Sequence, residues 1–197
     1  MKRWIVPVLA AALLLAASPA PFKVRQALDR AVMGEREAIA RYEAFAKKAE
    51  EEGYLGVASL FRAAARGEGV HLRRFVEAMQ ARGLNPPGEV EHHPVVGSTA
   101  DNLRNASAAE AAERDGTYRE AILAAEESED DALRKVFDQT RDTEVEHANL
   151  FNTAARQLAS MKEQRTYYVC DHCGYTTDVD LPLCALCRDR DHPHAVK

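Results

Sequence analysis

The sequence predicts an all-α fold, a four-helix bundle, followed by a small C-terminal module that a metal ion holds together. Three observations lead to this prediction: two long stretches rich in Ala, Glu, Arg and Leu, a repeat between these stretches, and four cysteines grouped near the C-terminus. With 197 residues, 46% hydrophobic and 29% charged, the chain has the composition of a globular protein. The formal net charge of -5 gives no electrostatic reason to expect a nucleic-acid partner.

Residues 1–22 have the composition of an export signal. Two basic residues precede an uncharged run whose apolar part spans residues 5–17, and small residues follow at 18–20. We therefore expect a periplasmic or otherwise exported protein, although Pro21 would hinder cleavage directly before it. An uncleaved membrane anchor is the alternative, with a run that is short for a span. Because closely spaced thiols are better protected in a reducing compartment, a cytoplasmic location also stays open.

Four helices are expected in the segment that follows. They span residues 24–52, 54–82, 99–127 and about 131–164. Gly53 follows a Glu-rich turn and is a typical helix stop. The linker at residues 83–99 is rich in Pro, Gly and His, which indicates a crossover loop between the second and third helices.

The two halves of this region repeat each other. Phe61, Glu68, His71 and Phe75 recur as Phe137, Glu144, His147 and Phe151, each 76 positions later. Tyr42 and Tyr118 have the same offset, and Glu35 and Glu110 are 75 positions apart. Such a repeat indicates a duplicated helical hairpin. Two hairpins joined by one long crossover form a four-helix bundle of the ferritin-like type.

The repeated acids fall at one height in this bundle. Glu35 lies 18 residues before Gly53 and Glu68 lies 15 after it, so at about 1.5 Å per residue they are nearly level. The same holds for Glu110 and Glu144 about the turn near residue 128.

His71 and His147 each follow a glutamate by three positions and share its helix face. A single Glu-x-x-His is common on helix surfaces, but two aligned copies with level acids predict a buried site for two divalent cations. Carboxylate and imidazole ligands suit iron or manganese.

Tyr42 and Tyr118 lie two turns beyond Glu35 and Glu110 and face the same interior. Their hydroxyl groups are positioned to hydrogen-bond the metal-binding carboxylates. The alternative is that each is a core aromatic whose hydroxyl finds another buried partner.

The cysteines form two Cys-x-x-Cys pairs, Cys170 with Cys173 and Cys184 with Cys187. The segment 165–197 is too short to build a stabilising core of its own, so a tetrathiolate metal site is expected to supply the folding energy. Paired disulfides are the alternative. Spacing alone does not separate iron from zinc.

Together, the segment from Gly34-Glu35 to Arg41-Tyr42, the two Glu-x-x-His copies and the cysteine tail resemble rubrerythrin. The resemblance covers residues 23–197, and Cys173-Gly174-Tyr175 is similar to a rubredoxin knuckle. It implies a ferritin-like di-iron domain at 23–164 and a rubredoxin-like domain at 165–197. The ligands it implies for the di-iron centre are Glu35, Glu68, His71, Glu110, Glu113, Glu144 and His147. It favours iron over zinc in the tail.

The same resemblance implies a peroxidase. Its members reduce hydrogen peroxide to water, with electrons that come from NADH through a separate reductase or rubredoxin. One iron shifts between a histidine and the extra glutamate on redox change, which here would be His71 and Glu113. Members form homodimers in which one subunit's tail lies near its partner's di-iron site. The alternative is a ferritin-like ferroxidase or iron-handling protein with a structural zinc tail.

Overall fold

The computed structural model describes residues 21–189, 191 and 193–197. The predicted export signal or anchor therefore lies outside the described residues, apart from its last two. None of the helices in the described part of the chain is long and apolar enough to cross a membrane.

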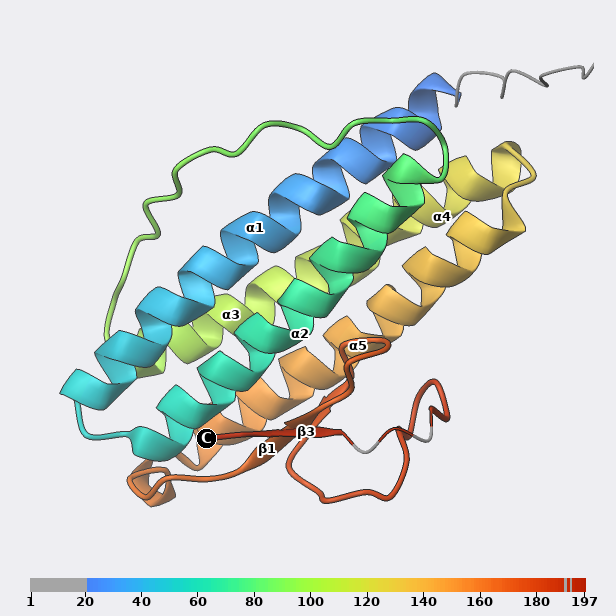
Figure 1. Ribbon diagram of the computed structural model, residues 1–197. Helices are drawn as coiled ribbons and strands as arrows, with labels where there is room; N and C mark the ends of the chain where they lie inside the picture. The colour runs from blue at the N-terminus through green and yellow to red at the C-terminus, as the bar shows by residue number, and fades with distance from the viewer. Residues whose placement is uncertain (1–20, 190, 192) are drawn as a thin grey trace, which may run out of the picture.

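Four helical rods pack side by side in a bundle, as the sequence predicts (Figure 1). The helices are α1 (Phe22–Glu51), α2 (Leu55–Gln80), α3 (Thr99–Ala112), α4 (Tyr118–Glu127) and α5 (Asp131–Arg156). A π-helical turn, η1 (Glu113–Thr117), joins α3 to α4, and together these three form the third rod. The segment between α2 and α3 runs along the outside of the bundle, which gives the expected ferritin-like connectivity (Figure 1).

Local chemistry fixes the two hairpin turns. Gly53 has a φ of 79°, a left-handed conformation that is accessible to glycine at little cost, and it reverses the chain after α1. At the other hairpin, Asp130 caps α5 by accepting a hydrogen bond from the Leu133 amide at 3.0 Å. Arg82, beyond the end of α2, holds Asp130 with two hydrogen bonds of 2.7 Å and thereby ties the two hairpins together.

The π-helical turn explains the difference between the two repeat offsets. Glu110 and Tyr118 are eight residues apart, whereas Glu35 and Tyr42 are seven apart. The extra residue falls within Glu113–Thr117, where the helix widens to i→i+5 hydrogen bonding. Glu110 and Tyr118 therefore both face the interior, as their counterparts do in α1.

Two apolar clusters fill the bundle, one on each side of the acid and histidine layer. In α1, residues 24–32 belong to one cluster and residues 38–49 to the other, with Glu35 between them. In α2, residues 57–64 and 75–79 flank Glu68 and His71 in the same way. The polar layer is therefore sealed from both ends by packed side chains, many of them aromatic.

The fourth helix was predicted to continue to about residue 164, and that prediction is wrong. It ends at Arg156, and a short 3₁₀ turn, η2 (Leu158–Ser160), follows. Met161 then buries its side chain in the bundle core, while its carbonyl accepts a hydrogen bond from the Gly56 amide at 3.0 Å. Burial of this side chain outweighs the helical propensity of residues 157–164.

The tail forms a small antiparallel sheet that lies against its own bundle. Its strands are β1 (Tyr167–Val169), β2 (Thr176–Thr177) and β3 (His194–Val196), in the order β2-β1-β3. Tyr167 and Val169 are buried in the same apolar cluster as Phe61 and Met161 of the bundle segment. The tail packs beside α2 and α5 (Figure 1), so part of its core is shared with the bundle.

Candidate metal centres

Six of the seven predicted bundle ligands converge at mid-bundle, where they form two overlapping groups. One group is Glu35, Glu68, His71 and Glu144, and the other is Glu68, Glu110, Glu144 and His147; in each, the potential ligand atoms lie within 4.8 Å of one another. All six residues are buried. Because Glu68 and Glu144 belong to both groups, the arrangement has the form of two metal positions bridged by two carboxylates.

Both histidines turn the same nitrogen towards the carboxylates. His71 Nδ1 lies 2.8 Å from Glu68 and 3.3 Å from Glu144, and His147 Nδ1 lies 3.1 Å from each of these two glutamates. The outer nitrogens face hydroxyl groups. His71 Nε2 is 2.8 Å from Thr143 Oγ1, whose own proton goes to the Thr140 carbonyl.

Hydrogen bonding therefore fixes the tautomer of each ring. Thr143 Oγ1 donates elsewhere, so it must accept from His71 Nε2, and the Cys173 carbonyl accepts from the same nitrogen at 3.1 Å. His147 Nε2 donates to Thr176 Oγ1 at 3.0 Å, and that hydroxyl in turn donates to the Gly174 carbonyl. With protons on both outer nitrogens, the Nδ1 lone pairs are free for metal ions.

The charges of this layer depend on protons when no cation is bound. Burial, together with the neighbouring carboxylate of Glu68, raises the pKa of Glu35 well above its usual value. Burial and the charge of Glu144 do the same to the pKa of Glu110. Burial lowers the pKa of His147, but the charges and hydrogen bonds of Glu68 and Glu144 together outweigh it and raise that pKa to about 10. The layer is neutral only if protons, or metal cations in their place, balance the carboxylates.

Orphaned oxygen atoms show that the layer fits metal ions. Glu35 Oε2, Glu68 Oε1 and Glu144 Oε1 are buried and accept no hydrogen bond. Leaving a buried polar atom without a partner costs about 1–3 kcal/mol, and more for a charged one. Cations held by the two groups would coordinate these oxygens. The set of carboxylates and imidazoles suits iron or manganese.

The two tyrosines bind carboxylates across the bundle. The Tyr42 hydroxyl in α1 donates to Glu110 in α3, and the Tyr118 hydroxyl in α4 donates to Glu35 in α1. Burial raises the pKa of both phenols well above the usual value, so they stay neutral donors. Each tyrosine thus holds a glutamate that belongs to one group only, and neither holds a shared glutamate.

Glu113 lies outside both ligand groups. It is part of the π-helical turn, its side chain is 22% exposed, and its carboxylate is 3.8 Å from Arg41 Nη2. Arg41 also approaches Glu37 at 3.5 Å. Sequence reasoning did not identify Arg41 as a partner of Glu113 and Glu37. Its position one residue before Tyr42, in the segment that resembles rubrerythrin, was a clue.

Sequence reasoning also missed the residues around the outer histidine nitrogens. Thr143 immediately precedes Glu144 in the fourth helix, so its proximity to the site could have been inferred. Thr176 and the carbonyl of Cys173 reach the site only because the tail folds onto the bundle. No pattern in the sequence shows where the tail packs.

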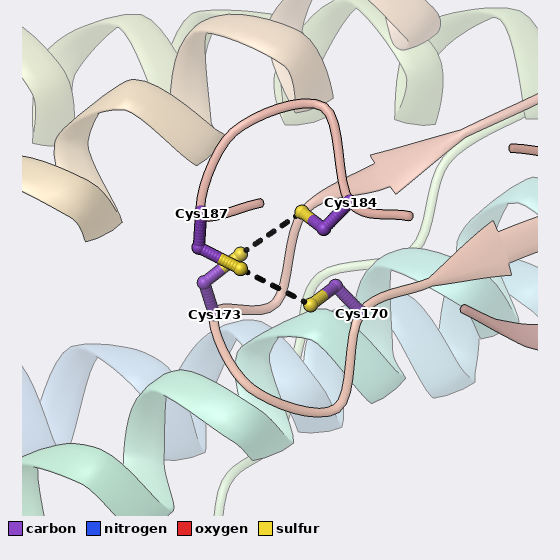
Figure 2. Close-up of side chains that lie close together, drawn as sticks. All are labelled: Cys170, Cys173, Cys184 and Cys187. Atoms are coloured by element: carbon purple, nitrogen blue, oxygen red, sulfur yellow. Dashed lines mark hydrogen bonds between the residues drawn. The ribbon is translucent and has the colours of Figure 1, made fainter. Parts of the chain in front are cut away.

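The four cysteines of the tail converge on one point (Figure 2). Cys170 Sγ lies 3.6 Å from Cys187 Sγ, and Cys173 Sγ lies 3.5 Å from Cys184 Sγ. All four are free thiols, which argues against the disulfide alternative. Sulfur atoms that surround a central ion at about 2.3 Å are about 3.8 Å apart, close to these distances.

A cation would also stabilise the thiolate of Cys173. Hydrogen bonding by Cys170 and Cys184, together with burial, raises the pKa of Cys173 far above its usual value. Its thiolate is therefore unfavourable unless a metal ion is present to compensate its charge. The donor set of four sulfurs fits iron or zinc.

A ferritin-like bundle with two overlapping groups of buried glutamates and histidines and a tetracysteine module defines the class of this protein. Comparison with known proteins agrees, because a family model described as rubrerythrin matches residues 26–155. The chain belongs to the rubrerythrin family.

Similarity to individual relatives extends over most of the chain. It is 31% identical to a rubrerythrin of Porphyromonas gingivalis, over 88% of each chain. It is 30% identical to a nigerythrin of Nitratidesulfovibrio vulgaris, over 81% of this chain and 79% of the relative. Among solved structures, nigerythrin in a mixed-valence state superposes with a TM-score of 0.80 at 28% identity and covers 99% of this chain and 100% of its own.

Proposed function

We propose that this chain is a non-haem di-iron peroxidase that reduces hydrogen peroxide to water, H₂O₂ + 2 e⁻ + 2 H⁺ → 2 H₂O. Its electrons would pass through the iron of its own tetracysteine tail. The observation that carries the proposal is the hydrogen bond between His71, a candidate ligand of the bundle site, and the carbonyl of Cys173, a candidate ligand of the tail site. A ferroxidase or iron-handling protein has no need of an electron carrier in contact with its metal centre.

Iron in both sites would supply the chemistry, two electrons from the pair for the O–O bond and one electron at a time from the tail. The candidate di-iron ligands are the six converging residues together with Glu113. By resemblance, His71 and Glu113 would be the two residues that exchange as ligands of one iron. The hydroxyl groups of Tyr42 and Tyr118 hold Glu110 and Glu35 in place throughout.

A surface cavity of about 300 Å³ offers a route for the substrate. It is lined by Gly34, Glu37 and Glu113, and Tyr118 also borders it. We infer that peroxide, which is small and polar, reaches the metal centre along this side of the bundle, where Glu113 is the partly exposed member of the ligand set.

The electron donor must be a separate protein, because the chain has no glycine-rich nucleotide-binding loop. We propose an NADH-linked reductase, acting directly or through a rubredoxin. By the same resemblance, the protein is proposed to be a homodimer.

Metal analysis and absorption spectroscopy of the purified, oxidised protein test the assignment. We expect three iron ions per chain and the red colour of an oxidised iron tetrathiolate, which peroxide restores after anaerobic reduction. The Cys170→Ser variant should keep the bundle iron but lose both the colour and reduction by the donor. A colourless zinc tail and a reduced centre that does not react with peroxide would favour the iron-handling alternative.

Export also stays a proposal. N-terminal sequencing of the mature protein from separated cell compartments tests it, because cleavage near residues 18–22 predicts a new N-terminus outside the cytoplasm. Recovery of intact Met1 in the cytoplasm would contradict it.

A further inference from the structure

The internal repeat is broken at a buried position one turn away from the metal layer. Thr140 lies four residues before Glu144 on α5. The equivalent residue on α2, 76 positions earlier and four before Glu68, is Ala64. Both side chains are fully buried. The second hairpin therefore brings a hydroxyl group into the bundle interior where the first hairpin has only a methyl group.

Contacts of α5 place Thr140 at the edge of the layer, on the side of His71. The Thr140 carbonyl accepts the proton of Thr143 Oγ1 at 2.6 Å, and the same Oγ1 lies 2.8 Å from His71 Nε2. Phe137, three residues earlier, belongs to the apolar cluster at this end of the bundle, and Glu144, four residues later, belongs to both ligand groups. Helical spacing thus puts Thr140 between the packed rings and the ligands.

The hydroxyl oxygen of Thr140 is buried and has no hydrogen-bond partner. Serine and threonine inside a helix commonly donate to the carbonyl four residues earlier. Ser59 and Ser128 do so in this chain, at 3.0 and 2.8 Å. Because Thr140 does not, its hydroxyl lowers the stability of the fold relative to a valine of the same shape. Such a cost beside a metal layer indicates that the partner of the hydroxyl is a molecule that binds there.

Hydrogen-bond donors are what the layer lacks once its protons are replaced by metal ions. Its carboxylates and the inward imidazole nitrogens then offer lone pairs only. The hydroxyl groups of Tyr42 and Tyr118 donate to carboxylates, and those of Thr143 and Thr176 donate to backbone carbonyls. Of these hydroxyl groups and that of Thr140, only the last keeps its proton for a further acceptor.

We propose that Thr140 is a ligand-binding residue, whose hydroxyl donates a hydrogen bond to a small molecule with lone pairs, such as hydrogen peroxide or azide, held in the metal layer on the side of His71. The identity of the ligand as peroxide rests on the proposed function, whereas the hydrogen bond does not. The proton stays on Thr140, and no covalent bond forms or breaks in this step. Ala64 offers no such donor in the first hairpin, so the ligand is held from one side of the layer.

Three variants separate the hydroxyl group from the shape of the side chain. Thr140→Val keeps the branched shape and removes the donor, whereas Thr140→Ser keeps the donor and removes a methyl group. Thr153→Val makes the same exchange at an exposed position of α5 and is the matched control. The iron content of every variant is measured first, and affinities are compared per di-iron centre.

Urea unfolding of the metal-free protein tests whether the hydroxyl lacks a partner within the fold. We expect the equilibrium constant for unfolding to fall by about tenfold in Thr140→Val, because a buried donor without a partner is removed. Thr153→Val should match the wild type. A Thr140→Val protein that is less stable than the wild type would show that the fold itself satisfies this hydroxyl, which would overturn the proposal.

Azide titration of the oxidised, iron-loaded protein, followed by absorption, tests ligand binding without turnover. We expect the Kd for azide to rise by about tenfold or more in Thr140→Val, the usual effect of losing a hydrogen bond to a charged partner. Thr140→Ser and Thr153→Val should bind azide as the wild type does. The KM for peroxide should rise in Thr140→Val by a similar factor, with a smaller change in kcat.

Equal azide affinity in the wild type and Thr140→Val would overturn the proposal, and so would equal losses of affinity in Thr140→Val and Thr140→Ser. The proposed function fails separately. A wild type that binds azide more tightly than Thr140→Val but does not reduce peroxide would sink the peroxidase assignment and leave the role of Thr140 in ligand binding standing.

Discussion

Four buried glutamates and two buried histidines occupy one layer of the bundle, and their charges must balance there. Glu35 and Glu110 gain pKa values that favour the protonated acid, whereas Glu68 and Glu144 have lowered pKa values. For Glu68, burial raises the pKa, but the charges and hydrogen bonds of His147 and His71 together outweigh it. The pKa values of these residues therefore determine which of them hold protons when no metal ion is bound.

Replacing Glu68 by alanine should empty the bundle site while the tail keeps its colour. Glu68 belongs to both ligand groups, so its loss removes an oxygen donor from both metal positions. Metal analysis together with the visible spectrum checks this outcome. Glu126→Ala, an exposed acid on α4, is the control, and full metal content in Glu68→Ala would contradict the assignment.

Without metal, the protein should lose stability as the pH rises from about 6.5 to about 10. The pKa of His147 is 6.5 in an ordinary environment and about 10 in the fold, so the folded state holds a proton that the unfolded state has released in this interval. This stabilisation is complete below pH 6.5 and is lost as the pH passes through the folded pKa. Urea unfolding of metal-free protein at several pH values measures it. The loaded protein should lack this loss, because metal replaces the proton, and an equal loss in both forms would contradict the explanation.

At the scale of elements, the one irregular helix lies beside the metal layer. The π-helical turn absorbs a single extra residue and leaves the helix on both sides in register, so Tyr118 still reaches Glu35. The same third rod is capped by Ser98, whose side chain accepts a hydrogen bond from the Asp101 amide at 3.2 Å, and a second acceptor at this end comes from elsewhere in the fold. The Thr99 amide donates to the carboxylate of Glu52 at 2.9 Å, which joins the end of α1 to the start of α3.

Replacing Glu52 by alanine should lower the free energy of unfolding by about 1 kcal/mol, the usual effect of losing a helix cap. Hydrogen bonds from Thr99 lower the pKa of Glu52, so its contribution is present above pH 4.5 and is lost as the pH falls through the lowered value. Urea unfolding at pH 7 and in acid measures the difference between variant and wild type. Glu51→Ala, its exposed neighbour, is the control, and an equal effect of both substitutions would argue against the cap.

At the scale of the whole molecule, the bundle and the tail share an apolar core. Met161, Tyr167 and Val169 pack in the same cluster as residues of α1 and α2. The predicted boundary between residues 164 and 165 thus passes through a continuous packed region. The boundary marks a change in the character of the sequence. Because the core is shared, we expect unfolding of the tail to destabilise this end of the bundle.

Met161→Ala should destabilise the bundle by about 2–5 kcal/mol, the range for truncating a buried aliphatic side chain. Met161 is 2% exposed although it follows the last helix. Thermal or urea unfolding followed by far-ultraviolet circular dichroism, which reports the helices, measures the effect. Met33→Ala, with a side chain that is 47% exposed, should have little effect. A similar small effect of Met161→Ala would mean that the connection merely passes over the bundle.

The sequence by itself determined the four-helix bundle, the residues of the acid and histidine layer and the four cysteines. These follow from local periodicity and from an internal repeat, and both patterns can be read directly from the sequence. The offset between Glu35 and Glu110 is 75, whereas it is 76 elsewhere in the repeat, and this difference of one residue corresponds to the π-helical turn. That the shared glutamates are Glu68 and Glu144, and that the tyrosines bind the other two, required the helices to be assembled.

Only the tertiary structure decided where α5 ends and where the tail lies. The helix ends before Met161 because burying this side chain stabilises the fold more than continuing the helix would. That burial depends on residues far away in the sequence, such as Gly56. Likewise, Gly67 looks like any helix glycine until Gly174 is packed against it and the Cys173 carbonyl reaches His71. Contacts between segments about 100 residues apart depend on three-dimensional shape, which local sequence patterns do not specify.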